Sequence, residues 1–478
     1  MLFNTFQFIW LFPLIFCIRI AINATQINEE KLNKIENFLL IAISYGLYLQ
    51  WKPVYSLILL GVTLITYLSA LIIEKHIAHK KKAILFPCVF LTILPLIIFK
   101  YYNFLNENLT ALLNYIGISG NGLPGLNWVM PLGISFFTFQ SLSYLFDVYY
   151  NRIPAEKKWW DYMLFVCFFP QIACGPISRA KDLLPQIKTY RRFDEKQAIQ
   201  GLKWLLWGMF LKVVMADRIG IYVNSIFDNY EYQNGISCII GSILYTFQIY
   251  GDFAGYSFMA LGVGELMGFE LPNNFKRPYL SQSITEFWHR WHISLSTWLK
   301  DYVYIPLGGS RCSKLRSYWN IIVTFLVSGI WHGANWTFIV WGLIHGIFQV
   351  LEKILNLQKP NSKGILKFLR ISSTFIIVNL AWVFFRMPTL TDGLHVIKKM
   401  CVNHSGSIAY ISPSMKIFIV LSLVIVIIKD LMDEFLPKGR TLFYNKSVII
   451  RWTSYVSIVI LILLCGVFDA SQFIYVNF

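Results

Sequence analysis

Long runs of apolar residues recur along the whole chain, and they constrain its fold more than any other feature. One span of a bilayer needs about 20 mostly apolar residues, so the runs indicate roughly ten to twelve crossings or partial crossings. Charged residues make up only 14% of the 478 residues, well below the share found in a soluble domain. The sequence therefore predicts an all-α polytopic membrane protein, with residues 1–478 forming a single transmembrane domain.

The formal net charge of +17 has a simple explanation. Lys and Arg cluster in short segments that flank apolar runs, and no nucleic-acid-binding motif interrupts the spans, so we exclude nucleic acid as a partner. Because Lys and Arg in short loops mark the cytoplasmic side of a bilayer, residues 80–82 and 179–192 are expected in the cytoplasm. Residues 103–127 then form an outer loop. The N-terminus also lies outside, before a retained first span in the cytoplasmic (inner) membrane.

Two parts of the middle of the chain depart from a simple pattern of spans. Residues 161–178 are short and contain Pro170 and Pro176, which favours a re-entrant segment that lines a cavity. Residues 236–262 are apolar but carry Asp252 among aromatic and small residues, so Asp252 is a candidate supporting residue of a site. The eight cysteines are scattered without a C-x-x-C pattern, which indicates buried thiols and no metal site.

Residues 283–305 are predicted to form one strongly amphipathic helix. The segment opens with a capping-box pattern, Ser283 followed by Glu286, and its apolar residues recur with a period of 3.6. Arg290 and Asp301 lie off the apolar stripe and are further candidate supporting residues. A polar face of this kind is typical of a helix that lies in the membrane interface or lines a wet cavity.

His292 lies at the edge of that apolar stripe. An ionisable side chain is expensive in hydrocarbon, and one that stays there is by default a functional candidate. A buried histidine that is hydrogen-bonded for structural reasons is an equally good interpretation at this point. A metal site shared with His289 is a weak hypothesis, since no Cys or carboxylate ligand stands nearby.

His332 stands in the segment LVSGIWHGANWTFIVWGLIHG, among small residues that let a ligand approach closely. Histidine is the side chain best matched to moving protons near neutral pH. Asn335 could orient the imidazole or donate to an oxyanion, and Trp331 and Trp336 flank the site. The chain shows no Ser or Cys nucleophile motif, but a base that acts directly on a bound hydroxyl needs none. A role for His332 in linking helices stays open, and such a structural role is favoured for His345.

These segments resemble the membrane-bound O-acyltransferase family, specifically the bacterial branch of the alginate O-acetylases. The matching stretches follow the expected order along nearly the whole chain, and the long middle block is far more specific than a short motif. Gly251 departs from the pattern, because a Cys or similar residue is expected before Asp252. The stretches are MLFNTFQFIWLF, MPLGISFFTFQSLSYLFDVYYNRIP, FPQIACGPISR, QIYGDFAGYSFMALGVGELMGFELPNNFKRPYLSQSITEFWHRWHISLSTWLKDYVYIPLGGSR, SGIWHGANWTFIVWGLIHG, AWVFFRMP and FIYVNF.

The resemblance implies a ring of tilted helices around a thinned membrane centre, with a funnel open to the outside and a narrow channel to the cytoplasm. It places the family's essential histidine at His332 and the accompanying one at His292, within a catalytic core of residues 128–350. The implied donor is acetyl-CoA or another cytoplasmic acyl thioester. The implied acceptor is a hydroxyl of a polysaccharide such as alginate, or of a partner protein. The resemblance implies no bound cofactor and no metal.

Two other functions stay open. One is D-alanyl transfer to teichoic acid from a carrier-protein thioester. The other is glycan or ion transport, although a transporter should show repeated halves and the sequence shows no internal repeat. The outer loops, such as residues 103–127, are too short to bind a long glycan. We therefore expect an extracytoplasmic acyltransferase or glycan-binding partner beside the surrounding membrane lipid.

Overall fold

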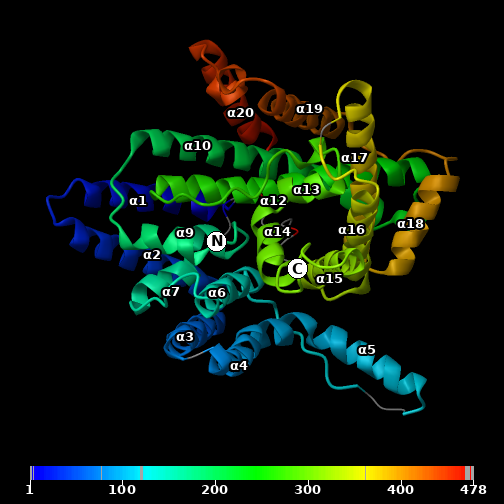
Figure 1. Cartoon of the computed structure of the whole chain (residues 1–478). Helices are drawn as coiled ribbons and strands as arrows, with labels where there is room; N and C mark the ends of the chain where they lie inside the picture. The colour runs from blue at the N-terminus through cyan, green and yellow to red at the C-terminus, as the bar shows by residue number, and fades with distance from the viewer. Residues whose placement is uncertain are drawn as a thin grey trace.

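Every regular element is helical in the part of the chain that the structure, a computed structural model, describes: residues 3, 5–76, 78–118, 122–360, 362–468 and 474 (Figure 1). This confirms the all-α prediction for those residues. The last matching stretch, FIYVNF, lies outside them except for Ile474. The α-helices are α1 (Phe6–Asn23), α2 (Glu29–Trp51), α3 (Pro53–Lys75), α4 (Ala78–Leu96), α5 (Tyr102–Tyr115), α6 (Ile134–Tyr149), α7 (Trp159–Cys167), α8 (Phe169–Ile172), α9 (Ala180–Lys188), α10 (Glu195–Met209), α11 (Asp217–Phe227), α12 (Gly235–Leu266), α13 (Ile284–Arg290), α14 (Ile293–Leu299), α15 (Lys314–His332), α16 (Trp336–Ile354), α17 (Gly364–Arg386), α18 (Leu390–Val402), α19 (Pro413–Phe435) and α20 (Val448–Cys465).

Six helical segments of the described chain are long and apolar enough to cross a membrane. This makes the chain a multi-pass membrane protein, as its composition predicts. The expected count of roughly ten to twelve crossings includes shorter or more charged helices such as α2 and α6, and that count stays a prediction. The six segments are Pro53–Lys75, Lys80–Tyr115, Gly235–Leu266, Trp336–Ile354, Gly364–Arg386 and Val448–Cys465.

Helices α10 and α12 run side by side through the middle of the molecule and form much of its core (Figure 1). Their backbones approach closely because glycines face each other across the contact. A Cβ at Gly208 would come within 2.5 Å of the Gly255 carbonyl oxygen, and one at Gly201 within 2.8 Å of that of Gly262. Small residues at facing positions are the usual means of close packing between membrane helices.

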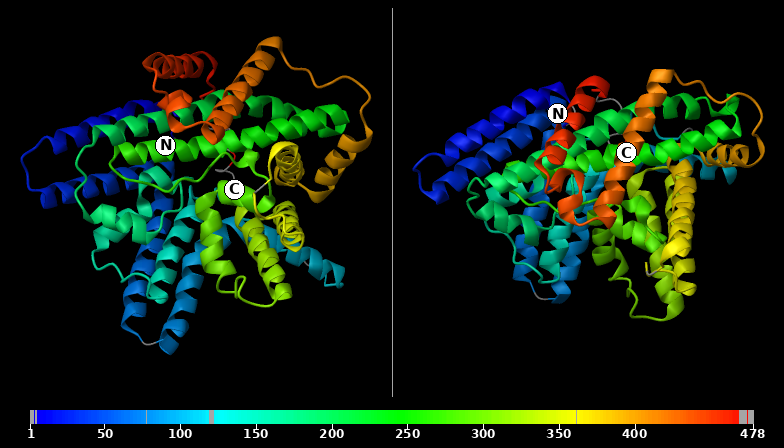
Figure 2. Two further views of the ribbon diagram at one scale, coloured as in Figure 1. Left: turned by 45° about the horizontal axis from the view of Figure 1, so that its top comes forward. Right: turned by 90° about the horizontal axis from the view of Figure 1, so that it is seen from above.

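Helices α15 and α16 form a second pair, joined by a short turn and therefore antiparallel (Figure 2). Both run at a steep angle to α12. Helix α13 packs against α16, and α14 follows α13 directly. This arrangement puts the end of α15 near the break between α13 and α14, so the two predicted histidines come from neighbouring parts of the fold.

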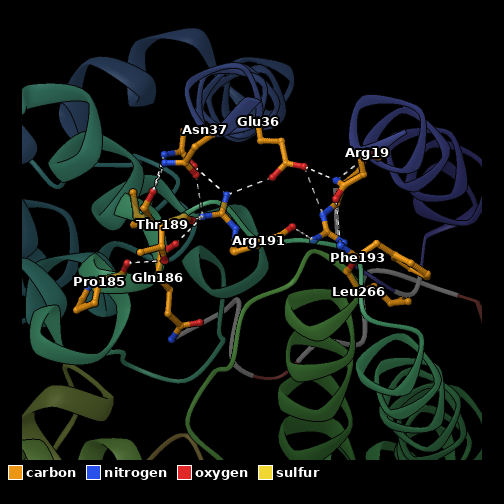
Figure 3. A network of polar contacts seen from close by, with 12 residues as sticks. Arg19, Glu36, Asn37, Pro185, Gln186, Thr189, Arg191, Phe193 and Leu266 are labelled. Carbon is orange, nitrogen blue, oxygen red and sulfur yellow. Dashed lines mark hydrogen bonds and ion pairs between the residues drawn. The ribbon is translucent and has the colours of Figure 1, made fainter. Parts of the chain in front are cut away.

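A buried polar network holds the basic loops at one end of the molecule (Figure 3). Arg19, near the end of α1, donates to the Leu266 carbonyl oxygen at 2.8 Å, near the end of α12. Arg191 donates to the Asn37 side chain at 3.0 Å. Glu36 lies between both guanidinium groups, at nitrogen–oxygen distances of 3.8 Å and 3.5 Å. Cationic groups near helix C-termini are favourable because they complement exposed carbonyl dipoles.

Further contacts tie the remaining basic segments to the same end. Lys81 and Lys188 each contact the segment of residues 151–156, and the cytoplasmic placement of residues 80–82 and 179–192 stays a prediction. Which face of the membrane this end meets stays a prediction. The contacts join Lys81 to Asn151 at 2.7 Å, Lys157 to Glu74, Lys188 to Glu156 and Arg192 to Glu29.

The predicted single helix over residues 283–305 is wrong, because the chain breaks between α13 and α14. His292 stands at the break in a left-handed conformation, with φ 43° and ψ 54°. Asn274 holds it, since its carbonyl accepts from Ile293 N at 3.0 Å and its side chain accepts from Ser294 N at 3.1 Å. The apolar period continues on both sides of the break, so periodicity alone does not reveal it.

Residues 103–127 are also not a loop throughout. Helix α4 continues through a π-helical turn, η1 (Ile97–Tyr101), into α5, so the chain stays helical to Tyr115. Residues 119–121, including Asn121, lie outside the described part. Residues 161–178 form two short helices, α7 and α8, with the bend at Phe168 between them. That bend agrees with an interrupted segment, while its re-entrant placement stays a prediction.

Candidate active site

His332 is the last residue of α15, and its imidazole is almost fully buried. Its Nδ1 lies 2.7 Å from the carbonyl oxygen of Ser328, one turn earlier in the helix. A carbonyl oxygen can only accept, so Nδ1 carries the hydrogen and Nε2 is the basic nitrogen of the neutral ring. The local structure therefore sets which ring nitrogen can take a proton.

The turn after His332 explains why the helix ends there. A side chain at Gly333 would collide with the ring of Phe338, so this position must stay small. Asn335 then caps α16, because its side chain accepts from Thr337 N at 3.0 Å. The same side chain donates to the Pro388 carbonyl oxygen at 2.7 Å. Its amide is thus engaged in holding the turn, and its orienting the imidazole or donating to an oxyanion stays a prediction.

His292 is fully buried in the break between α13 and α14. Neither ring nitrogen has a hydrogen-bond partner among the residues that the structure describes. The ring centroid lies 4.7 Å from that of Phe253 and 5.9 Å from that of Trp331. A non-glycine residue in the left-handed region is uncommon, and such strained positions concentrate at functional sites.

Trp331 lies between the two histidines, and Trp341 lies on another side of His332. The Trp331 ring centroid is 4.9 Å from that of His332, and the Trp341 centroid is 4.7 Å from it. Trp341 also packs against His345 at 5.1 Å. We call these five residues, His292, Trp331, His332, Trp341 and His345, the aromatic cluster. The structure thus brings together three of the predicted site residues, and it adds His345 and Trp341.

The indole N–H groups of the cluster are available to a ligand. Those of Trp331 and Trp341 are buried and find no acceptor within the described part of the chain. Buried donors without a partner are rare in proteins, and an ordered water or a ligand is one way to satisfy them. They stand beside the imidazole of His332, where a donor could stabilise negative charge.

Trp336 lies apart from the cluster. Its side chain is half exposed, and its Nε1 donates to Asn108 Oδ1 in α5 at 2.9 Å. Its ring also packs against Phe104 at 5.8 Å. Trp336 therefore connects the turn after His332 to α5.

Asp252 belongs to a buried ion-pair network. Its Oδ1 lies 2.6 Å from Lys212 Nζ, which lies equally close to Asp217 Oδ1. The three side chains are at most 1% exposed. The contacts join α12 to the π-helical turn η2 (Phe210–Ala216) and to α11, so Asp252 cross-links helices.

Arg290 and Asp301 also have ion-pair partners away from the cluster. Arg290 pairs with Glu286 at 2.6 Å and with Glu434 of α19 at 2.9 Å. Asp301 pairs with Arg179 at 2.9 Å. The capping hydrogen bond from Glu286 N to Ser283 Oγ, at 3.0 Å, is present as predicted.

Two cavities flank α14, and Ile293 and Thr297 line both. The first, of about 400 Å³, is lined by Arg152, Arg179, Lys181 and Asp301 among others. The second, of about 480 Å³, is lined by His289, Lys300, Lys353 and Ser328 among others. Ser328 is the residue whose carbonyl holds His332, so the second cavity reaches the immediate surroundings of the imidazole. Lysine and arginine side chains at both walls are suited to bind phosphate groups.

Sequence reasoning missed Lys100, the residue of η1 whose Nζ donates to the Trp331 carbonyl oxygen at 2.6 Å. The available signal was a lysine at the end of the apolar run FPCVFLTILPLIIFK. An ionisable residue in a membrane segment is a functional hypothesis by default.

Residues 43–387 match the model of the membrane-bound O-acyltransferase family, a range that includes both histidines and Lys100. The chain is 39% identical to a probable alginate O-acetylase of Pseudomonas syringae, over 76% of this chain and 69% of the relative. It is 35% identical to a peptidoglycan O-acetyltransferase of Helicobacter pylori, over 78% and 75%. It is 31% identical to a teichoic acid D-alanyltransferase of Streptococcus thermophilus, over 58% and 67%.

Proposed function

The chain belongs to the membrane-bound O-acyltransferase family and is an O-acyltransferase, and from that premise we propose its reaction. It transfers an acetyl group from cytoplasmic acetyl-CoA to a hydroxyl outside the cytoplasmic membrane. The product is an O-acetylated polysaccharide, alginate-like or another cell-surface glycan. His332 is the general base of this transfer.

The observation that carries the proposal is the orientation of the His332 imidazole. Its Nδ1 donates to the Ser328 carbonyl oxygen at 2.7 Å, so Nε2 is the ring nitrogen that can take up a proton. A positioned general base contributes about 10²- to 10⁴-fold to a rate. The surrounding rings exclude water. The base therefore takes its proton from a bound acceptor hydroxyl and not from bulk water.

The chemical step needs no covalent enzyme intermediate. The acceptor O–H bond breaks as its proton moves to His332 Nε2, and the acceptor oxygen bonds to the thioester carbonyl carbon. The carbon–sulfur bond then breaks, and the proton passes from His332 to the thiolate of CoA. The buried indole N–H groups of Trp331 and Trp341 are suited to donate to the oxyanion between these steps, a contribution typically of about 10²- to 10³-fold.

The donor is expected to enter from the end where the basic loops gather. The cavity lined by Arg152, Arg179 and Lys181 offers charges that suit the phosphates of CoA. The second cavity shares Ile293 and Thr297 with the first and is lined by Ser328, whose carbonyl contacts the imidazole. With this end in the cytoplasm, we expect an extracytoplasmic N-terminus.

Two relatives named for O-acetylation, at 39% and 35% identity, favour acetyl transfer over the D-alanyl alternative, whose relative is 31% identical over a smaller share of this chain. The transport hypothesis accounts for neither the match to an acyltransferase family nor the hydrogen bond that fixes the tautomer of His332. Labelled acetyl-CoA and a D-alanyl carrier-protein thioester, each incubated with the chain in lipid nanodiscs, separate these functions. We expect release of CoA thiol and label transfer with the first donor only.

The matched control for that experiment is His395→Ala, because His395 is exposed at α18 and outside the aromatic cluster. It should leave transfer unchanged, whereas His332→Ala should abolish it. Absence of acetyl transfer by the wild-type chain both in nanodiscs and in whole membranes that hold its partners would contradict the proposed function.

A partner protein completes the proposal. The described outer segments form no extramembrane domain that could grip a long glycan, so we propose a separate extracytoplasmic acyltransferase or glycan-binding partner. The hydroxyl that reaches His332 is then that of the partner or of a sugar it presents. Purified chain alone, given acetyl-CoA and polysaccharide, should acetylate far more slowly than whole membranes do. Equal rates would contradict the need for a partner.

A further inference from the structure

The last turn of α15 is unusual in how its terminal carbonyl groups are satisfied. Helices leave their final carbonyls without intrahelical donors. Here the Ser328 carbonyl accepts from His332 Nδ1 at 2.7 Å, and the Gly329 carbonyl accepts from Gly333 N at 3.3 Å. The Ile330 and Trp331 carbonyls accept from side chains of another helix.

Those two donors are consecutive residues of η1. Tyr101 donates its hydroxyl to the Ile330 carbonyl at 2.5 Å, and Lys100 donates its ammonium to the Trp331 carbonyl at 2.6 Å. The ammonium also lies 5.7 Å from the centre of the Trp331 ring. A π-helical turn is rare and is frequently found at functional sites. This turn therefore caps the helix end that carries His332.

One of the two capping donors, Lys100, is an ionisable residue inside an apolar helical segment. Lys100 lies within the candidate span Lys80–Tyr115. None of the ion pairs among the described residues includes it, and its ammonium is bound by a carbonyl. A lysine in a membrane segment without a paired carboxylate is expensive to keep. An ionisable residue kept there is by default a functional candidate, and its Nζ contact with the Trp331 carbonyl is the geometry that points to a role.

We propose that Lys100, assisted by Tyr101, is a positioning residue for the transfer reaction. The inference rests on the proposed function of His332. Lys100 fixes the Trp331 carbonyl, and with it the backbone from which the Trp331 ring and the His332 imidazole project. A displacement of about 1 Å at a reacting group costs on the order of 10²-fold in rate, so a loose helix end would matter. Substrate binding at the cavities beside α14 does not depend on this contact.

The test uses the full chain in nanodiscs with labelled acetyl-CoA. Lys100→Met should lower kcat by about 10- to 100-fold, with the donor KM unchanged. Lys100→Arg, which keeps a cationic donor, should restore most of kcat. Lys52→Met is the matched control, because Lys52 is an exposed lysine at the α2–α3 turn and should change neither constant.

Amide hydrogen exchange gives a readout that does not depend on turnover. In Lys100→Met, residues 329–336 should exchange faster while residues 314–327 stay protected. Tyr101→Phe removes one hydroxyl and should show the same pattern more weakly, and it decides the question if Lys100→Met does not fold. Unchanged kcat and unchanged exchange in an active, folded variant would overturn the proposal. Loss of acetyl transfer in the wild-type chain would instead count against the proposed function.

Discussion

The Nδ1 of His332 lies 2.7 Å from the carbonyl oxygen of Ser328, four residues earlier in the same helix. The imidazole thus caps its own helix through Nδ1, and Nε2 is the ring nitrogen that can take up a proton. Because the acceptor is a backbone atom, no side-chain substitution at Ser328 removes this orientation. Only a change of His332, or of the backbone that carries it, can do so.

His332→Ala should abolish acyl transfer, because the base is worth about 10²- to 10⁴-fold and no other ring takes its place. The protein should remain folded and inserted, since the lost hydrogen bond is a local cap. Transfer of labelled acetyl groups and the gel-filtration profile are measured together. A monodisperse variant with wild-type activity would remove His332 from the role of base.

His292→Ala should lower transfer less than His332→Ala does. Histidine already carries the cost of the left-handed backbone at φ 43°, and alanine, which adopts it less often, should add a small further destabilisation. His292→Asn separates the two effects, because Asn tolerates that geometry and lacks the imidazole. If the Asn variant is as active as the wild type while the Ala variant melts early, His292 is a structural residue.

Lys212→Met should strongly destabilise the protein without touching the aromatic cluster. The substitution leaves Asp217 and Asp252 buried without their cation, and breaking a buried pair costs about 3–5 kcal/mol. Lys34→Met is the control, because its ion pair with Glu30 is exposed and worth at most about 1 kcal/mol. Thermal unfolding in detergent is the measurement. Equal melting temperatures for the two variants would contradict a cross-linking role for Lys212.

Single cysteines at Lys82 and Tyr115 should label from opposite faces of the membrane, Lys82 from the cytoplasm. The prediction follows from the gathering of basic loops at the Lys82 end and from the helix that separates the two positions. Alanine first replaces the four exposed or half-buried native cysteines, Cys17, Cys88, Cys312 and Cys401. Labelling of Tyr115→Cys by an impermeant reagent only in opened cells would reverse the orientation.

The sequence predicted the local features of this protein well. Apolar runs predict its helices, and the turn at Lys52 between α2 and α3 follows from the proline after it. The apolar setting of His292 and His332 marked both as candidates, and the structure places both against Trp331.

What the sequence could not show depends on contacts between distant segments. Arg290 and Glu434 are 144 residues apart, so nothing in the local sequence reveals that the arginine is already paired. The break at His292 is held by Asn274, from a separate segment, and an unbroken apolar period hides it. In the sequence, Lys100 is one more lysine at the end of an apolar run. Its contact with the Trp331 carbonyl, 231 residues away, is visible only in the fold.

The gathering of cationic loops beside the cavity of Arg152 and Arg179 has a kinetic consequence. A polyanionic donor that diffuses toward this end meets an attractive potential that extends over roughly one Debye length, about 8 Å at physiological ionic strength. Added salt shortens that reach and slows encounter, while a transfer step buried among aromatic rings is screened much less. Added salt should therefore lower kcat/KM for the donor and leave kcat nearly constant.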